Sequence, residues 1–351
     1  MNAVYNASHT RKPLRIFIAA AFALLPLTAT HDAFACAACG DTLSRDWGTQ
    51  GVNTHPGFTA DLSYSYINQN QQRYGSGTAS SALISQLQGA GQEIEDYTVT
   101  RTIMATLNYT SDTWGVTTQL PYVQRTHGTF GTADLMGTSY SSSSDNSIGD
   151  IRITGRYTGF SAENASGIIA GIKLPTGSAN TNFNAGAGAN TPLDRSLQIG
   201  TGSTDLILGG FLTGTIVEYG WFAQGTVQHA VATKVIAGLD YRPGDAYALN
   251  TGIRYAKFGA KFTPMLQLNY IRRQPDTPDS GTNAGATPPD ALTGGPATGG
   301  TLVYLAPGAS LRIGGGTSVY GFLQLPVYQN VNSLQLSPRY TATVGVQHSF
   351  E

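Results

Sequence analysis

One repeated pattern constrains the fold of this chain more than any other feature: apolar and polar residues alternate over stretches of about ten to thirteen residues. In the first stretch, Phe58, Leu62 and Tyr66 alternate with Thr59 and Ser65. Successive side chains of a β-strand point to opposite faces, so each stretch predicts a strand with one apolar and one polar face. Between these strands the sequence shows no convincing helical period.

About twelve such strands follow one another along the chain. They are Phe58–Tyr66, Tyr97–Tyr109, Thr113–Gln124, Gly149–Gly159, Gly167–Leu174, Ser203–Thr213, Gly220–His229, Ala246–Tyr255, Ala260–Ile271, Thr301–Ile313, Ser318–Tyr328 and Tyr340–Phe350. Strands of soluble sandwiches usually have about five or six residues, whereas a tilted strand that crosses a membrane needs about nine to eleven. The lengths therefore favour an all-β membrane protein, a transmembrane antiparallel β-barrel, over a soluble sandwich.

The connections between the predicted strands alternate in length. Those after the first, third, fifth and ninth strands are long and polar, namely Asn68–Asp96, Arg125–Ile148, Pro175–Gly202 and Arg272–Gly300. Several others are short turns, such as Thr110–Asp112. A bacterial outer-membrane barrel has short periplasmic turns and longer extracellular loops. The order therefore predicts a barrel in the cell outer membrane with both termini in the periplasm.

Aromatic residues gather near the ends of the predicted strands, where a membrane barrel carries its aromatic girdles. The set is Tyr64, Tyr66, Tyr97, Tyr109, Trp114, Tyr122, Tyr157, Trp221, Tyr247, Tyr255, Tyr270 and Phe350. Any single tyrosine reflects ordinary strand propensity, so the argument depends on the whole set. Arg101 departs from the pattern because it falls on the apolar face, which places it at the headgroup level or requires a β-bulge beside it.

The first 35 residues have the order of a secretory signal peptide. A basic region with Arg11, Lys12 and Arg15 precedes the apolar run Ile16–Leu27. The small residues of Ala33–Ala35 then offer a cleavage site. The alternative is an amphipathic helix that stays attached to the chain.

Cleavage of a signal peptide at 1–35 leaves two parts, a periplasmic N-terminal segment at 36–57 and the barrel at 58–351. The segment begins with the pair Cys36 and Cys39. In an oxidising periplasm such a pair closes a small disulfide most simply. Lipid attachment at Cys36 is the alternative, although the residues before it lack the leucine of a lipobox.

Composition excludes several classes of function. Charged residues make up 12% of the chain and the formal net charge is −1, so nucleic acid is not an expected partner. Motifs of nucleophile elbows, metalloprotease helices and phosphate loops are missing, and we expect no cofactor, no metal site and no enzyme activity.

His127 could join a serine and an acid as in outer-membrane phospholipases, but a solvated loop histidine is the plainer interpretation. We assign Glu93 and Glu95 to the solubility of a loop.

Charged residues on the inward face of the predicted strands are the candidates for a role in the lumen. They are Asp61, Asp150, Arg152, Arg156, Lys173, Asp205, Arg254 and Arg312. Inward charges can tune the selectivity of a barrel. They can equally pair with one another and fill a narrow interior, because twelve strands enclose much less space than a sixteen-stranded porin. The excess of cations predicts a weak preference for anions if the lumen conducts.

The central part of the chain resembles a known family. The resemblance is carried by Asp150–Ile153, by Ile172–Ser178, by the Gln-x-Gly-Thr-Gly run within Leu197–Leu206 and by Gln324–Gln329. These motifs resemble the outer-membrane β-barrel family grouped as meta-pathway phenol-degradation proteins and labelled transporters. The resemblance covers most of the chain from Phe58 onward. It implies a barrel and the uptake of hydrophobic or aromatic compounds.

The last predicted strand resembles the C-terminal signal that the barrel-assembly machinery recognises. Thr343, Gly345 and Phe350 match that signal, whereas His348 takes the place of its penultimate aromatic residue and Glu351 follows the Phe. We therefore expect the barrel-assembly machinery and outer-membrane lipid among the partners of this chain.

Two classes of function compete for such a barrel. Passive transport of a small organic molecule is favoured by the strand pattern and by the resemblance. The alternative is a non-transporting anchor, a surface-binding protein or the partner of a periplasmic complex, with Cys36–Gly57 as its docking segment. Solute flux through liposomes that contain the purified barrel discriminates between the two.

Overall fold

The fold was analysed in a computed structural model. It describes Leu43, Gln50 and residues 56–134, 137–160, 165–236, 238–257, 261–277 and 289–350. The predicted signal peptide at 1–35 and the predicted disulfide between Cys36 and Cys39 lie outside the described residues. Within the described ranges, no helix has the length and apolar character needed to cross a membrane.

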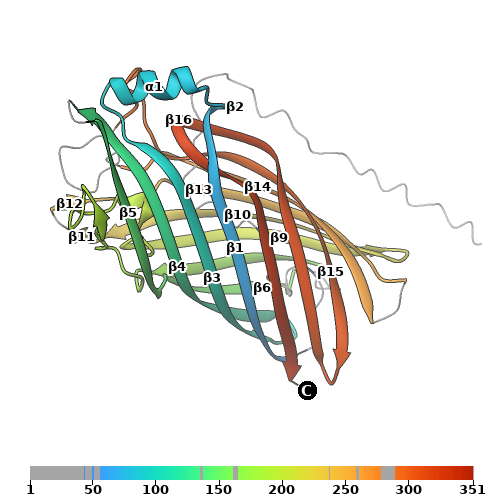
Figure 1. Cartoon of the computed structure of the whole chain (residues 1–351). Coiled ribbons are helices and arrows are strands. Elements are labelled where there is room, and N and C mark those ends of the chain that lie inside the picture. The colour runs from blue at the N-terminus through green and yellow to red at the C-terminus, as the bar shows by residue number, and fades with distance from the viewer. Residues whose placement is uncertain are drawn as a thin grey trace, which may run out of the picture. The chain divides into compact units, whose positions relative to one another are not determined.

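The described strands form an antiparallel sheet that closes on itself as a barrel (Figure 1). Around the ring the order is β1 (Gly57–Gly75), β3 (Ile94–Thr110), β4 (Trp114–Asp134), β6 (Ile151–Tyr157), β7 (Ser166–Leu174), β9 (Ser203–Ile216), β10 (Tyr219–Thr233), β13 (Ala246–Tyr255), β14 (Phe262–Arg273), β15 (Gly300–Gly314) and β16 (Thr317–Phe350). Each strand of this series pairs with the next one, and β1 closes the ring on β16. The predicted all-β antiparallel barrel is confirmed.

The last strand, β16, supplies two legs of the wall. Its first part pairs with β15 from Thr317 to Val331, and its second part pairs with β1 as far as Phe350. The chain turns back near Ser333, whose φ is 40°, and Figure 1 shows the ribbon rising and returning. A ring in which all neighbours are antiparallel needs an even number of legs. The eleven strands of the ring, with β16 counted twice, therefore give the twelve legs that the alternation predicts.

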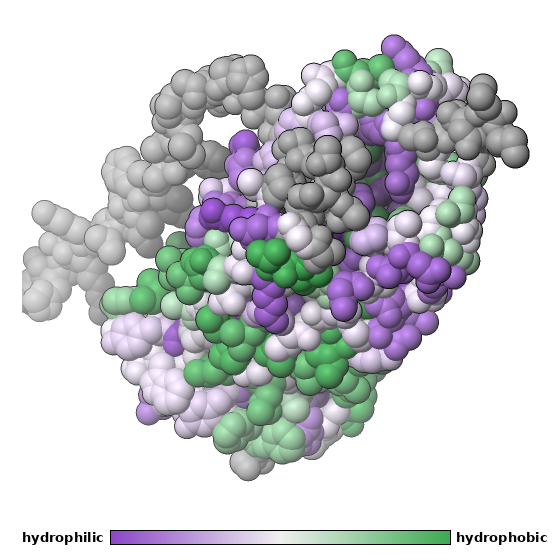
Figure 2. Space-filling view, turned by 90° about the vertical axis from the view of Figure 1, so that its left-hand side faces the viewer, coloured by the Kyte–Doolittle hydropathy of each residue, from purple (hydrophilic) through white to green (hydrophobic). Residues whose placement is uncertain are grey.

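The alternating residues of each strand face opposite sides of the barrel wall. Outward side chains are large and apolar, and Leu62, Leu107 and Leu208 expose 51%, 50% and 60% of their surface. Inward side chains are often polar and buried, as at Gln267 and Gln324. Figure 2 shows hydrophobic residues over the lower part of one face and hydrophilic residues around the upper part. The division between outward apolar and inward polar side chains fits a wall that lipid covers from outside and that polar side chains fill from inside.

Aromatic pairs mark both ends of the apolar zone. Near the C terminus, the ring centroids of Phe58 and Tyr109 are 4.8 Å apart. At the other end of the zone, those of Tyr66 and Tyr340 are 6.4 Å apart. Arg101 lies opposite Tyr66 in an unbroken register, and its guanidinium is 5.8 Å from the ring centroid of Tyr66. Arg101 therefore lies at the level of the outer girdle, and the wall needs no β-bulge to accommodate it.

The prediction of a long loop is wrong for two segments of the chain. Much of Asn68–Asp96 and Arg125–Ile148 is strand, because β1, β3 and β4 continue beyond the apolar zone and β4 pairs there with β5 (Gly137–Ile148). Outside the lipid a strand has water on both faces and no longer needs an apolar face. The alternation that reveals the membrane strands therefore stops at the outer girdle, although the hydrogen-bonded ladder continues.

A short helix, α1 (Ser81–Gly89), also departs from the expectation of no helix. The hydroxyl of Ser80 accepts the N–H of Leu83 at 3.2 Å and caps the helix. Leu87 of this helix is fully buried, and the Gln88 amide donates to the carbonyl of Gly131 on β4 at 3.2 Å. The remaining elements are β2 (Gly77–Thr78), β8 (Ala185–Gly186), η1 (Arg195–Leu197), β11 (Val235–Ile236) and β12 (Leu239–Asp240).

The two ends of the barrel differ in their connections. Near Phe350 the strands are joined by tight turns, such as the one between β15 and β16, where Gly315 and Gly316 have φ of 50° and 74°. The opposite end carries α1, β2, β5, β11 and β12 (Figure 1). Since outer-membrane barrels keep their short turns in the periplasm, the end with α1 is extracellular.

Candidate functional site

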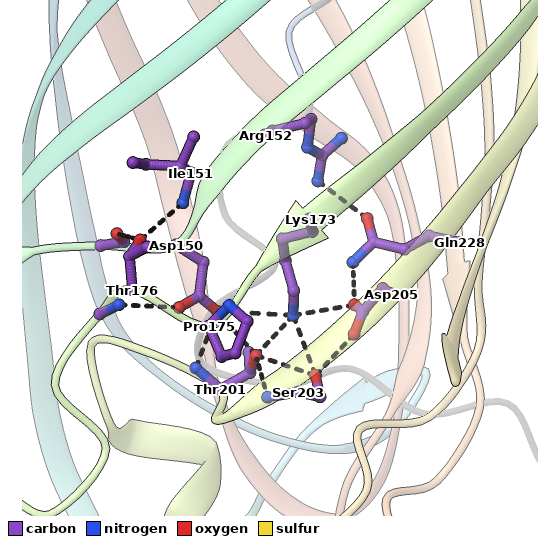
Figure 3. Close-up of polar contacts among 12 residues, drawn as sticks. Asp150, Ile151, Arg152, Lys173, Pro175, Thr176, Thr201, Ser203, Asp205 and Gln228 are labelled. Atoms are coloured by element: carbon purple, nitrogen blue, oxygen red, sulfur yellow. Dashed lines mark hydrogen bonds and ion pairs between the residues drawn. The ribbon is translucent and has the colours of Figure 1, made fainter. Parts of the chain in front are cut away.

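A buried ion-pair network lies on the inner wall at the extracellular ends of β6, β7 and β9 (Figure 3). The Nζ atom of Lys173 is 2.8 Å from Asp205 Oδ2 and 3.5 Å from Asp150 Oδ2. The three side chains expose only 2% to 8% of their surface. Lys173 and Asp205 are direct partners in the β7–β9 register, so the antiparallel ladder itself brings these charges together.

The network extends sideways to a neighbouring strand. Arg152 is opposite Lys173 in the β6–β7 register, and its guanidinium donates to the side-chain oxygen of Gln228 at 2.8 Å. The amide of Gln228 in turn donates to Asp205 Oδ2 at 2.5 Å, and the hydroxyl of Ser203 donates to Asp205 Oδ1 at 2.6 Å. We call Asp150, Arg152, Lys173, Asp205 and Gln228 the charged wall.

Asp150 also holds the connection between β7 and β9, Pro175–Gly202, which we call the mouth loop. One carboxylate oxygen of Asp150 accepts the backbone N–H of Gly177 at 3.0 Å. The other accepts the backbone N–H of Thr201 at 2.9 Å and its hydroxyl at 2.7 Å. One carboxylate thus binds both ends of the loop, and Thr201 also receives a hydrogen bond from Lys173 Nζ at 2.5 Å.

The two ends of the mouth loop touch at a pair of glycines. Gly200 donates its N–H to the carbonyl of Ser178 at 2.6 Å. A Cβ atom at Gly200 would lie 2.3 Å from the carbonyl oxygen of Gly177, and one at Gly177 would lie 2.7 Å from the Cα of Gly200. No side chain fits between these backbones. We call the contact of Gly177 and Gly200, with the bonds of Asp150 to the loop, the neck.

The body of the mouth loop packs against the inner face of β4. Arg125 Nη1 donates to the carbonyls of Leu197 and Gln198 at 2.8 and 2.9 Å. Phe183 forms an apolar cluster with Leu193 and Leu197, and its ring centroid lies 6.2 Å from that of His127. Because Arg125 and His127 are inward residues of β4, the loop lies on the lumen side of the wall.

The expectation of a solvated loop histidine at His127 is wrong. The side chain is fully buried on β4, and Nδ1 lies 2.9 Å from the hydroxyl of Thr98. Burial, together with the nearby charge of Arg125, lowers the pKa of His127 to about 4. The imidazole is therefore neutral at pH 7 and serves as a hydrogen-bonded packing group behind the mouth loop.

The other candidate residues of the lumen are separate from this network. Nearer the periplasmic end, Arg156 donates to Asn108 Oδ1 at 2.8 Å and to the Thr110 hydroxyl at 2.5 Å. Asp61 accepts the phenol O–H of Tyr320 at 3.1 Å. Two further arginines differ from these: the guanidinium of Arg254 donates to the carbonyl of Gln50 at 2.5 Å, whereas Arg312 is exposed near the periplasmic rim.

Sequence reasoning missed several residues that hold the mouth loop. The sequence places Arg125 in a loop, because no apolar and polar alternation continues through Gln124–Thr129. Arg195 donates to the carbonyls of Ala179 and Thr201, both at 2.8 Å. Backbone carbonyls carry no sequence signal, so a partner of this kind could not be found from residue types.

A second region of the inner wall is apolar. Leu302 and Tyr304 on β15 are buried in one cluster, and Ala306 joins Tyr320 and Phe322 of β16 in another. The rings of Tyr320 and Phe322 meet edge to face, with centroids 6.2 Å apart. We call these five residues the apolar wall.

An apolar groove of about 640 Å³ lies on the outer surface of β14, β15, β16, β1 and β3. Its lining includes outward side chains such as Leu62, Phe262 and Val344, so lipid chains cover it in the membrane. Within the described ranges, no group of three or more His, Cys, Asp or Glu side chains is arranged to hold a metal ion.

The closed barrel, its aromatic girdles and its apolar outer face define an outer-membrane β-barrel. The model of the family described as "Putative MetA-pathway of phenol degradation" matches residues 92–321. The chain belongs to this family, which confirms the resemblance inferred from its motifs. No curated protein matches the sequence.

Solved structures of bacterial outer-membrane proteins are similar to this chain. The COG4313 outer membrane channel from Pseudomonas putida F1 is 11% identical, with a TM-score of 0.58 over 84% of this chain and 96% of that chain. The toluene transporter TbuX of Ralstonia pickettii is 12% identical, with a TM-score of 0.46 over 85% and 90%. The toluene transporter TodX of Pseudomonas putida is 9% identical, with a TM-score of 0.45 over 88% and 94%. The first of these shows that the two chains share the barrel fold.

Proposed function

We propose that this protein is a passive outer-membrane channel for small hydrophobic or aromatic molecules. The observation that carries the proposal is the apolar wall, which presents Tyr304, Tyr320 and Phe322 toward the inside of the barrel. The interior of an outer-membrane barrel that conducts water is polar. These rings are buried, and Leu43 packs against Tyr320 and Phe322. An apolar or aromatic solute that displaces Leu43 gains a surface on which it loses contact with water.

Two comparisons support the same substrate class and mode of action. The family description refers to phenol degradation, and a phenol-degrading cell must bring aromatic molecules across its outer membrane. The structure that shares the fold is named an outer membrane channel. A channel needs no catalytic group and no energy source, which agrees with the lack of catalytic motifs in the sequence.

The test is uptake of labelled solutes by cells that make the native chain, a variant or no protein. We expect the native chain to raise uptake of toluene and phenol more than uptake of glucose. Phe322→Asn places an amide on the apolar wall and should remove most of that gain. Tyr328→Asn, which changes an outward aromatic residue of the same strand, is the matched control and should retain it. Equal uptake of toluene and glucose would contradict the proposal.

One observation favours the alternative of a barrel that does not transport. Leu43 packs with Ala306, Tyr320 and Phe322, so this N-terminal residue lies against the apolar wall. The hydrogen bond from Arg254 to the carbonyl of Gln50 likewise places Gln50 against the inner wall. If these residues fill the lumen permanently, purified barrel in liposomes will pass neither ions nor aromatic solutes, and the anchor or docking role becomes the better explanation.

A further inference from the structure

The family motifs of this chain meet at the neck of the mouth loop. The Lys-Leu-Pro-Thr-Gly run places Lys173 and Gly177 at the start of the loop, and the Gln-x-Gly-Thr-Gly run places Gly200 and Thr201 at its end. Asp150, from the motif that begins β6, binds both ends. Three separate motifs therefore build one structural device, which closes the loop at its base.

The device positions a segment that occupies part of the entrance. The body of the loop, residues 178–199, covers inward residues of β4 and pairs with the free edge of β5 through β8. Its contacts to the wall include the Thr181 hydroxyl, which donates to Asp145 at 2.6 Å, and the Asn184 amide, which donates to the carbonyl of Ser144 at 2.9 Å. A segment held on the lumen side of the wall narrows the opening through which a solute enters.

We propose that Asp150 and Lys173 are the positioning residues of a built-in constriction: they close the neck and so hold the mouth loop across the entrance. The inference rests on the proposed channel function and adds the structural element, the mouth loop, that limits the size of the solute. The single positive charge of Lys173 lies between the carboxylates of Asp150 and Asp205 and offsets their repulsion, so Asp150 stays in place as the acceptor for both ends of the loop. The charged wall thus acts on the loop and does not itself select the solute.

The geometry of the neck allows a direct test by excision. Because the backbones of Gly177 and Gly200 already touch, residues 178–199 can be removed and the glycines joined without displacing β7 or β9. We expect the excised barrel to show a single-channel conductance about two-fold or more above the native value, since pore diameter limits passage. Asp150→Asn should move the conductance of the full chain toward that of the excised barrel. Adding Asp150→Asn to the excised barrel should change nothing further.

Tryptic cleavage tests whether the neck holds the mouth loop, without a transport assay. Arg195 is the only Lys or Arg between residues 178 and 199, and it is 4% exposed. Trypsin should therefore leave the native loop intact and cut after Arg195 when Asp150→Asn releases the neck. Thr201→Val, a milder change, removes one hydroxyl bond to Asp150 and should give partial cutting. Heat-modifiable migration on a gel confirms that each variant barrel is folded.

The matched control removes a carboxylate from an exposed ion pair. Glu218 lies 3.8 Å from Lys257 near the periplasmic end, and Glu218→Gln should leave both conductance and tryptic protection unchanged. The proposal is overturned if excision leaves conductance unchanged, or if Asp150→Asn leaves Arg195 protected. Neither conductance nor tryptic cleavage uses an aromatic solute. If both change as expected while aromatic uptake fails, the solute class is rejected and the constriction is kept.

Discussion

Opposite walls of the lumen use their side chains in different ways. The charged wall lies on β6, β7, β9 and β10 and on Asp150 just before β6, and the apolar wall lies on β15 and β16, across the ring from β6, β7 and β9. On the charged wall, Lys173 is bound by Asp150 and Asp205, and Arg152 is bound by Gln228. On the apolar wall, Tyr304, Tyr320 and Phe322 pack in apolar clusters.

A narrow barrel can bury charged side chains only where other groups bind them. A buried ion pair repays its loss of water only if its remaining donors and acceptors are also satisfied. The charged wall meets this condition by binding the ends of the mouth loop through Asp150 and Thr201. Its charges are therefore engaged in structure, whereas the apolar wall is buried by its own packing and by Leu43.

The largest expected effect breaks the charged wall at its centre. Lys173→Met leaves Asp150 and Asp205 as two buried carboxylates without their cation. Removing one partner of a buried pair costs about 3 to 5 kcal/mol, and we expect a loss of this size in the free energy of unfolding, measured by urea titration of the barrel in lipid vesicles.

The exposed pair of Lys257 and Glu218 provides the control for that experiment. Its side chains expose 63% and 39% of their surface and lie 3.8 Å apart, and such surface pairs contribute about 0 to 1 kcal/mol. Lys257→Met should therefore change the midpoint very little. If both lysine variants lose the same amount, the charged wall is not a buried network and the contrast between the two walls fails.

A smaller effect is expected at the neck. Gly200→Ala forces a methyl group to within 2.3 Å of the carbonyl oxygen of Gly177, and overpacking of this kind costs about 1 to 3 kcal/mol. Gly225→Ala is the matched control, because its Cβ would meet only the carbonyl of Ala248, at 3.9 Å. The free energies of unfolding of the two variants, from urea titration, should differ by that amount. Equal midpoints would mean that the mouth loop moves aside freely.

The barrel could be predicted from the sequence further than the site could. Lipid imposes a two-residue period on every crossing strand, so the membrane strands from Phe58 onward and the family were found correctly. The upper parts of β4 and β5 were missed because no lipid imposes that period on them. Lys173 and Asp205 were both placed in the lumen, but their direct pairing depends on the β7–β9 register, which the alternation alone does not determine.

The charges of the lumen also predict a limited selectivity for ions. Among the candidate lumen residues other than exposed Arg312, the cations are Arg152, Arg156, Lys173 and Arg254, and the carboxylates are Asp61, Asp150 and Asp205. We expect a weak preference for anions, blunted by salt over a Debye length of roughly 8 Å at physiological ionic strength. The measurement is the reversal potential of single channels in a salt gradient.

A double variant sharpens that measurement. Arg152→Gln with Arg156→Gln should lower the anion preference, because the focused field in a low-dielectric wall depends on net charge. Since both arginines also hold neutral partners, Gln228 for one and Asn108 for the other, we expect only a modest change. Cation preference in the native channel would contradict the expected effect of the excess of cations among these residues.

The smallest expected effect concerns Glu95, which lies on β3 at the extracellular end, on neither wall. Burial, with the charge of Glu93 beside it, raises the pKa of Glu95 from 4.5 to about 7. The folded state then binds more protons than the unfolded state between these two values, so its contribution to stability is complete below about pH 4.5 and is lost as the pH rises through about 7. Amide exchange in α1 and the start of β3, corrected for intrinsic rates, should therefore be slower at pH 6 than at pH 8. Glu95→Gln should make the two rates equal, and a native chain with equal protection at both pH values would show that water reaches this carboxylate.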